Sequence, residues 1–166
     1  MKKEISRLVN KTNIEINKMG SRQHYLRFDI TNTWKLIEQN GLLYDTSMGF
    51  ADQIGFKAGV CYPFPLYNIK ERKKYNLWEI PLVVMDSTLK GYMELNSKEA
   101  IIKVENIINT IKRYNGIFSL LWHNSTLDDS WGNDTYINLL NLISSYNILS
   151  LNGRNIIEEF LKMKNS

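Results

Sequence analysis

The sequence of 166 residues predicts a mixed α/β fold in which parallel strands are flanked by helices. Two observations favour this class. In the second half of the chain, short apolar runs bounded by turn residues alternate with stretches whose apolar residues recur every three or four positions. An order of strand, helix, strand and helix implies a parallel sheet with right-handed crossovers. The hydrophobic content of 43% is enough for one domain with a real core.

The first half of the chain predicts two helices and two strands. In chain order these are a helix over 3–12, a strand or strand end over 21–28, a helix over 32–40 and a short strand over 42–44. The second helix is expected to turn Trp34 and Ile37 inward. Asp29 or Thr31 is its expected cap, and Gly41 follows its end.

The segment 46–76 predicts an irregular loop. It holds three glycines, two of the three prolines and many aromatic residues, namely Phe50, Phe56, Tyr62, Phe64, Tyr67 and Tyr75. This aromatic content argues against disorder, and a long ordered loop in a compact domain is usually functional. The aromatic side chains either stack on a sugar ring or anchor the loop to the core.

The second half predicts three strands and three helices. The strands cover 77–85, 116–124 and 148–151, and the helices begin at Asn96, near Gly132 and after Asn152. Pro81 removes one donor from the first of these strands, which predicts a bulge or an edge position.

The helix that begins at Asn96 has the clearest pattern. Asn96 and Glu99 have the spacing of a capping box, and Gly116 follows its end. Its expected apolar stripe is Ala100, Ile101, Val104, Ile107, Ile108 and Ile111. The helix over 132–146 is expected to face inward with Ile137, Leu140 and Ile143, and the last helix with Ile156, Ile157, Phe160 and Leu161.

Composition excludes several classes of protein. The net charge of +4 is modest, and the densest basic cluster, Lys70 to Lys74, has no nucleic-acid-binding motif, so no nucleic acid partner is expected. Residues 1–20 do not resemble a signal peptide, and no apolar run is long enough to span a membrane. A cytoplasmic location is therefore expected. The single cysteine, Cys61, excludes an internal disulfide and predicts a buried, inert thiol.

His123 is the best catalytic candidate. It ends the apolar run 116–124, and a parallel strand that ends in a titratable side chain delivers it to the edge where α/β folds keep their active sites. One interpretation is a general acid, because an imidazole exchanges protons near neutral pH with little tuning. The other is a structural histidine at the edge of the core. His24 is expected to have a structural or substrate-contacting role.

Other chemistries have weaker patterns. Two histidines cannot form a His-rich metal site, although His24 and His123 could meet with Asp86, Asp128 or Asp129. The Gly-x-Ser-x-Gly elbow of serine hydrolases and the glycine-rich phosphate loop are both absent from the sequence.

Five stretches carry a resemblance to a known family. They are Gly20–Phe28, Tyr44–Phe50, Gly55–Gly59, Glu79–Leu82 and Leu120–Asn124. In this order and spacing they resemble the polysaccharide deacetylase (NodB-homology) family, and most closely a divergent bacterial branch of it. The resemblance covers residues 20–163.

The resemblance implies a distorted (β/α) barrel and a metal-dependent hydrolase, usually a zinc enzyme, that removes N-acetyl groups from sugars. Leu121-Trp122-His123 matches the family's Leu-x-His motif. The resemblance therefore gives His123 the role of protonating the leaving amine, and it places Leu121 and Trp122 in the acetyl pocket. Arg22 is similar to the arginine that orients the catalytic aspartate, and His24 stands where the family has a proline.

The family's base and metal ligands belong to motifs that precede the position of Gly20. Residues 1–19 contain neither a histidine nor an aspartate. We therefore expect a single partial domain over 1–166, with a leading helix in 1–19 and the C-terminal half of a barrel in 20–163. Such a chain is expected to lack the zinc ligands, to be inactive alone and to pair with an N-terminal half or a partner chain.

His24 and Tyr62 are expected to contact the carbohydrate, an N-acetylated sugar. The alternative function is a non-catalytic carbohydrate-binding or interaction module that uses the aromatic loop over 50–67.

Overall fold

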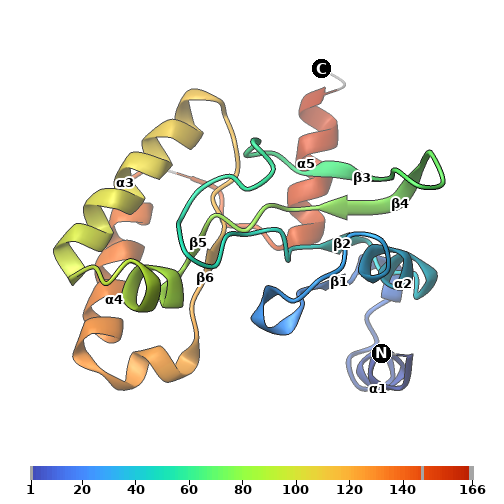
Figure 1. Cartoon of the computed structure of the whole chain (residues 1–166), viewed down its shortest axis with the longest axis horizontal. Helices are drawn as coiled ribbons and strands as arrows, with labels where there is room; N and C mark the ends of the chain where they lie inside the picture. Colours follow the sequence, from blue (N-terminus) through green and yellow to red (C-terminus); the bar gives the residue numbers. More distant parts are fainter. Residues whose placement is uncertain (1, 147, 165–166) are drawn as a thin grey trace. The chain divides into compact units, whose positions relative to one another are not determined.

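The structure, a computed structural model, describes residues 2–146 and 148–164 and shows two compact units (Figure 1). Unit 1 is formed by the described parts of Met1–Met48, Pro63–Ile80 and Leu151–Ser166, and unit 2 by those of Gly49–Tyr62 and Pro81–Ser150. Each unit has its own sheet and its own hydrophobic core.

The sheet of unit 1 has four strands in the order β1-β2-β4-β3. These are β1 (Gly20–Ser21), β2 (Tyr44–Asp45), β4 (Lys73–Glu79) and β3 (Phe64–Asn68). The first three run parallel, and β3 forms an antiparallel hairpin with β4 (Figure 1). The register pairs Ser21 with Asp45 and Asp45 with Glu79. These three residues, the strand-end row, therefore lie side by side where the parallel strands end.

Three helices belong to unit 1: α1 (Lys2–Thr12), α2 (Thr33–Gln39) and α5 (Gly153–Lys164). The core contains Trp34, Ile37, Leu42, Leu66, Tyr75 and Leu77. The predicted helices over 3–12 and 32–40 are confirmed, as is the burial of Trp34 and Ile37. Gly41 has a φ of 78°, the left-handed conformation that favours glycine after a helix.

The ring of Tyr44 determines how α5 meets the sheet. A Cβ atom at Gly20 would lie 2.1 Å from this ring, and a Cβ atom at Gly153 would lie 2.3 Å from it. A side chain at either position would therefore require the Tyr44 ring to move. Phe160 of α5 adds an edge contact to Trp78 of β4, with ring centroids 6.2 Å apart.

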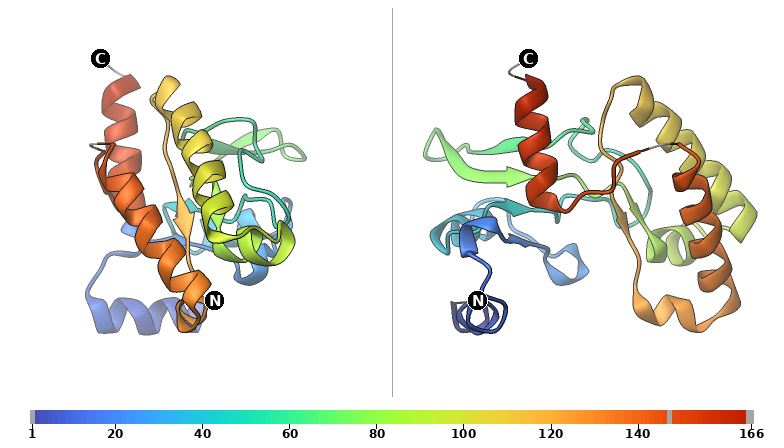
Figure 2. Two further views of the ribbon diagram at one scale, coloured as in Figure 1. Left: turned by 90° about the vertical axis from the view of Figure 1, so that its left-hand side faces the viewer. Right: turned by 180° about the vertical axis from the view of Figure 1, so that it is seen from behind.

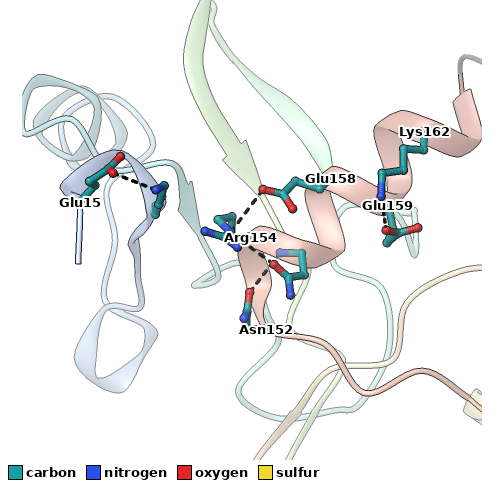
Figure 3. A network of polar contacts seen from close by, with 8 residues as sticks. Glu15, Asn152, Arg154, Glu158, Glu159 and Lys162 are labelled. Carbon is teal, nitrogen blue, oxygen red and sulfur yellow. Dashed lines mark hydrogen bonds and ion pairs between the residues drawn. The ribbon is translucent and has the colours of Figure 1, made fainter. Parts of the chain in front are cut away.

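A polar network runs along α5 (Figure 3). The side chain of Asn152 accepts the N–H of Asn155 at 3.0 Å, which confirms Asn152 as the cap. Arg154 pairs with Glu158 at 3.3 Å, and Lys162 pairs with Glu159 at 2.6 Å. Exposed ion pairs contribute little to stability, so packing is the main restraint on α5.

Unit 2 joins two strands and two long helices. They are β5 (Val84–Met85), β6 (Leu120–Leu121), α3 (Ser97–Arg113) and α4 (Ser130–Ser144). The strands are parallel, and the helices lie side by side (Figure 2). A π-helical turn, Thr88–Tyr92, and a 3₁₀ turn, Asn124–Asp128, connect them. Cys61 is buried in this core, as predicted, and burial raises the pKa of its thiol.

The predicted capping box of α3 is confirmed. The side chain of Asn96 accepts the N–H of Glu99 at 3.1 Å, and the side chain of Glu99 accepts the N–H of Asn96 at 3.0 Å. The apolar stripe faces the core as predicted, with Ala100, Val104, Ile108 and Ile111 buried and Ile101 and Ile107 partly buried.

The predicted strand over 21–28 is wrong beyond Ser21. Tyr25 and Leu26 have φ angles of 57° and 51°, so the chain turns there into a short 3₁₀ helix, His24–Leu26. The predicted cap of α2 is also wrong. Asn32 occupies the N-cap position, but its side chain does not cap the helix and donates to Asp29 instead. Asp29 accepts the N–H of Thr31 in the preceding turn.

The predicted strand over 77–85 is interrupted. β4 ends at Glu79 and β5 begins at Val84, and Pro81, which has no N–H, lies between them. The predicted irregular loop over 46–76 in fact contains β3 and the start of β4. The sequence did not reveal these strands, because their hairpin depends on pairing between residues such as Tyr67 and Lys74 that local patterns do not show. The predicted strand over 42–44 is found at Tyr44–Asp45.

The two later strands are shorter than predicted. In the run 116–124 only Leu120–Leu121 pairs as a strand, and the N–H of Ile117 bonds to the carbonyl of Cys61 at 2.7 Å instead. Residues 148–151 do not form a strand, and Leu149 is 80% exposed. Parallel pairing in the second half is therefore confirmed for β5 and β6 alone.

The predicted inward face of α4 is wrong for Ile137 and Leu140, whereas Ile143 packs partly buried against the core as predicted. Thr135 and Leu139 are buried, whereas Ile137 and Leu140 are 48% and 41% exposed. Asp134 is the only charged residue of α4, so apolar residues occur all round the helix and its periodicity does not select the buried face.

The mixed α/β class with parallel strands and flanking helices is confirmed. Within residues 2–146 and 148–164, neither sheet closes into a barrel. None of the helices in these ranges combines the length and the apolar character that crossing a bilayer requires.

Replacing Asn96 with alanine tests the capping box of α3. The variant removes the acceptor for the N–H of Glu99, and we expect a loss of about 1 kcal/mol in the free energy of unfolding. Urea unfolding followed by circular dichroism measures this loss. Asn106→Ala, at an exposed position within the same helix, is the matched control and should not destabilise the protein. Equal losses in both variants would contradict the capping role.

Candidate functional site

His123 lies where the chain leaves the parallel strands of unit 2. β6 ends at Leu121, and the backbone of His123 is still extended, with φ −82° and ψ 139°. The 3₁₀ turn Asn124–Asp128 follows at once. The side chain of His123 is 45% exposed, so solvent or a ligand can reach the ring.

The carboxylate of Asp86 holds His123 in place. Asp86 follows β5 and is fully buried. Its Oδ1 lies 2.6 Å from Nδ1 of His123, and its Oδ2 accepts both the backbone N–H of His123 at 3.0 Å and the hydroxyl of Thr126. Because Met85 is in register with Leu121, the parallel strands deliver Asp86 and His123 to the same edge.

This pairing determines which nitrogen of His123 can react. A carboxylate only accepts hydrogen bonds, so Nδ1 carries the proton that points to Asp86. Within the described residues, Nε2 makes no hydrogen bond. An imidazole oriented by a carboxylate in this way can give or take a proton at its other nitrogen.

Leu121 and Trp122 lie on opposite faces of the extended chain, since successive side chains alternate. Trp122 packs against the core of unit 2. Its ring stacks on Trp131, with centroids 5.9 Å apart and planes inclined by 8°, and lies 5.3 Å from Tyr136. Of the two residues expected in an acetyl pocket, Leu121 is the one that shares a face with His123.

Tyr62 is half-buried in unit 2. Its ring packs against the core, and its hydroxyl donates to the carbonyl of Tyr114. Phe56 packs against the same core, and Phe64 packs against the core of unit 1. These contacts favour the interpretation that the aromatic side chains anchor the loop to the core. Tyr67 differs from the others, because it is 51% exposed.

Unit 1 contains a second group of buried polar residues, around the strand-end row. Asp45 and Glu79 are fully buried. Oδ1 of Asp45 accepts the hydroxyls of Ser21 at 2.8 Å and Ser47 at 3.0 Å, and Oε1 of Glu79 accepts the N–H of Met48 at 2.8 Å. The other oxygens, Oδ2 of Asp45 and Oε2 of Glu79, have no hydrogen-bond partner in the described part of the chain.

Burial raises the pKa of both carboxyl groups. Loss of solvent, followed by the charge of Asp45, raises the pKa of Glu79 to about 8. Burial likewise raises the pKa of Asp45, and the hydroxyls of Ser21 and Ser47 partly offset this effect. Glu79 is therefore mostly neutral at pH 7.

Arg22 and His24 follow β1 and belong to unit 1. The guanidinium of Arg22 donates to the carbonyl of Thr46 at 3.2 Å and to its hydroxyl at 3.0 Å. The charge of Arg22 also acts on Asp45 and Glu79. His24 is exposed, and its ring centroid lies 4.2 Å from that of Tyr25.

Sequence reasoning missed the roles of Asp45 and Glu79. Each ends a parallel strand, the same signal that singled out His123. However, β2 has only two residues, and the predicted strand over 77–85 placed Glu79 in its interior and not at its end. The sequence offered Asp86, Asp128 and Asp129 equally as partners of the histidines. The structure pairs Asp86 with His123, whereas Asp129 caps α4 and pairs with Lys90.

The zinc that the family resemblance implies does not fit the described residues. Among them, no three side chains of His, Cys, Asp or Glu are grouped so as to hold a metal ion. Nδ1 of His123 is already bonded to Asp86. No step of the reaction proposed below is therefore assigned to a metal.

Compared with known proteins, the sequence matches no protein-family model and no curated protein. The fold and the site together define an α/β protein with a carboxylate-oriented histidine at the edge of a parallel strand pair.

Replacing Asp86 with asparagine tests the orientation of His123. The amide keeps the shape of the carboxylate but removes one acceptor, so His123 should lose its preference for a proton on Nδ1. We expect a cost of about 1 to 3 kcal/mol in the free energy of unfolding as well, because a buried hydrogen bond is lost. Proton–nitrogen NMR spectra of the imidazole rings report the tautomer, with His24 as internal control. An unchanged tautomer at His123 would show that Asp86 does not orient the ring.

Proposed function

We propose that unit 2 carries the general acid of a polysaccharide-deacetylase-like site, within the C-terminal half of a distorted (β/α) barrel. The observation that supports this function best is the pairing of His123 with the buried Asp86 at 2.6 Å. His123 lies within the Leu120–Asn124 stretch that resembles the family's Leu-x-His motif.

The proposed reaction is hydrolysis of an N-acetyl group on a sugar. Water adds to the acetyl carbonyl carbon, and the bond between this carbon and the sugar nitrogen then breaks. The nitrogen takes a proton from Nε2 of His123 and leaves as an amine, while the acetyl carbon and the water oxygen leave as acetate. The ring recovers its proton from the water that was added. Asp86 holds Nε2 in a fixed direction throughout.

The residues that activate the water are proposed to lie on another polypeptide segment. The resemblance assigns the base and the metal ligands to motifs upstream of the position of Gly20. The reaction therefore needs an N-terminal half or a partner chain that carries these motifs, and the chain by itself is expected to be inactive.

Release of acetate from a chitin tetrasaccharide tests this function. The chain is assayed alone and after co-expression with a polypeptide that carries the family's Thr-Phe-Asp-Asp and His-x-x-x-His motifs. We expect turnover in the combined preparation and a loss of about 10²- to 10⁴-fold in His123→Ala, because the leaving amine is no longer protonated. Ser125→Ala, at an exposed position two residues away, is the matched control and should keep its activity.

Two results would contradict the proposal. Full activity of a monomeric chain that melts cooperatively on its own would overturn the half-barrel. Equal turnover in the His123→Ala variant and the parent would remove His123 as the acid. Sugar binding without turnover that survives His123→Ala would instead support the carbohydrate-binding module.

A further inference from the structure

Asp45 and Glu79 in unit 1 present a problem of charge. They are adjacent in the parallel register of β2 and β4, and neither has any exposed surface. Arg22 is the cation whose charge acts on both, and its guanidinium hydrogen bonds go to Thr46. Two ionised carboxylates and one guanidinium would leave a net negative charge away from water, whereas one retained proton makes the cluster neutral.

The hydrogen bonds of the two carboxyl groups show where such a proton belongs. Each group has one oxygen that is bonded and one that is not: Oδ2 of Asp45 and Oε2 of Glu79 are buried without a partner among the described residues. A buried acceptor without a partner is costly. A proton on Oε2 of Glu79 turns this oxygen into a donor, and Oδ2 of Asp45 on the adjacent strand is the acceptor that still needs one.

We propose that Asp45 and Glu79 share one proton, and that this carboxyl pair holds the segments that follow β1 and β2 in place. The proposal concerns unit 1 and does not depend on the function proposed for His123.

The carboxyl pair is the common support of several loop contacts. Glu79 accepts the N–H of Met48 at 2.8 Å, and Asp45 accepts the hydroxyl of Ser47 at 3.0 Å. Ser47 in turn accepts the N–H of Gln23 at 2.9 Å, at the start of the turn that contains His24. Removing the shared proton places two like charges side by side in a buried site and weakens this whole set of contacts.

The other groups around the pair do not supply a second counter-charge. From α2, the indole N–H of Trp34 acts on the Asp45 carboxyl, but it is neutral and supplies no charge. Also on α2, Lys35 pairs with Glu71, and Glu38 accepts the N–H of Asn76.

The remaining neighbours also add no positive charge to the carboxyl pair. On β3, Phe64 stands opposite Glu79, and on β2 the phenol of Tyr44 has a pKa that burial raises, so it stays neutral. On α5, Arg154 pairs with Glu158 (Figure 3). Arg22 therefore remains the cation that acts on the pair.

The pH dependence of the stability follows from the pKa of Glu79 in the folded and in the unfolded protein. The folded protein keeps the proton on Glu79 up to a pKa of about 8, whereas an unfolded chain releases it near the usual 4.5. The stabilising contribution is therefore complete below pH 4.5 and is lost as the pH rises towards 8.

Titration of the carboxyl carbons by NMR tests the shared proton in the unmodified chain. In protein labelled with ¹³C at the Asp and Glu carboxyl groups, we expect the Glu79 signal to remain that of a protonated acid at neutral pH and to move near pH 8. The Asp45 signal should respond in the same step. Titration of Glu79 near 4.5, the usual value for a glutamate, would overturn the proposal. A shift of the Glu79 signal on adding Mg²⁺ or Ca²⁺ at neutral pH would also overturn it, since a cation would then occupy the place of the proton.

Glu79→Gln tests the effect on the loops. The glutamine amide can still accept the N–H of Met48 and can donate to Oδ2 of Asp45, so it imitates the protonated acid. We expect the exchange protection of the Met48 and Gln23 N–H groups to fall about tenfold or more between about pH 7 and pH 9 in the parent, and to stay constant in this variant. Glu15→Gln, an exposed control in the same unit, should behave like the parent. Protection that falls equally in Glu79→Gln would contradict the proposal.

Discussion

A carboxylate that has no contact with water must find its partners inside the protein, and each unit is arranged around this requirement. In unit 2 the partners of Asp86 are the backbone and ring of His123 and the hydroxyl of Thr126. In unit 1 the partners of Asp45 are two serine hydroxyls. Both carboxylates follow or end a parallel strand of two residues, so very short strands are enough to place them.

The two sites differ in the hydrogen bonds of their buried carboxyl groups and in their exposure to solvent. Both oxygens of Asp86 accept hydrogen bonds, and its partner ring, that of His123, is 45% exposed. Asp45 and Glu79 lie side by side on adjacent strands, each with an oxygen that has no hydrogen bond in the described part of the chain, and both are fully buried. One arrangement is therefore suited to exchanging protons with a ligand, and the other to keeping the backbone of its neighbouring loops in place.

The sequence predicted those features that depend on neighbouring residues. The capping box of Asn96 and Glu99, the stripe of α3 and the strand-end position of His123 are all of this kind. It did not predict the hairpin of β3 and β4 or the buried face of α4, because pairing and burial there depend on distant segments. The same limit hid Asp45 and Glu79: two polar residues, separated by a long apparent loop, become a site only when their strands pair.

The packing of Tyr44 has a consequence for how sequences of this kind can diverge. Its ring fills the space above Gly20 and Gly153, which come from opposite ends of the chain. A side chain can be accepted at either glycine only if the ring of Tyr44 moves or the residue at position 44 becomes smaller. Positions 20, 44 and 153 should therefore co-vary as a trio during evolution, and a homologue can be aligned across its full length by finding an aromatic residue matched to two distant glycines.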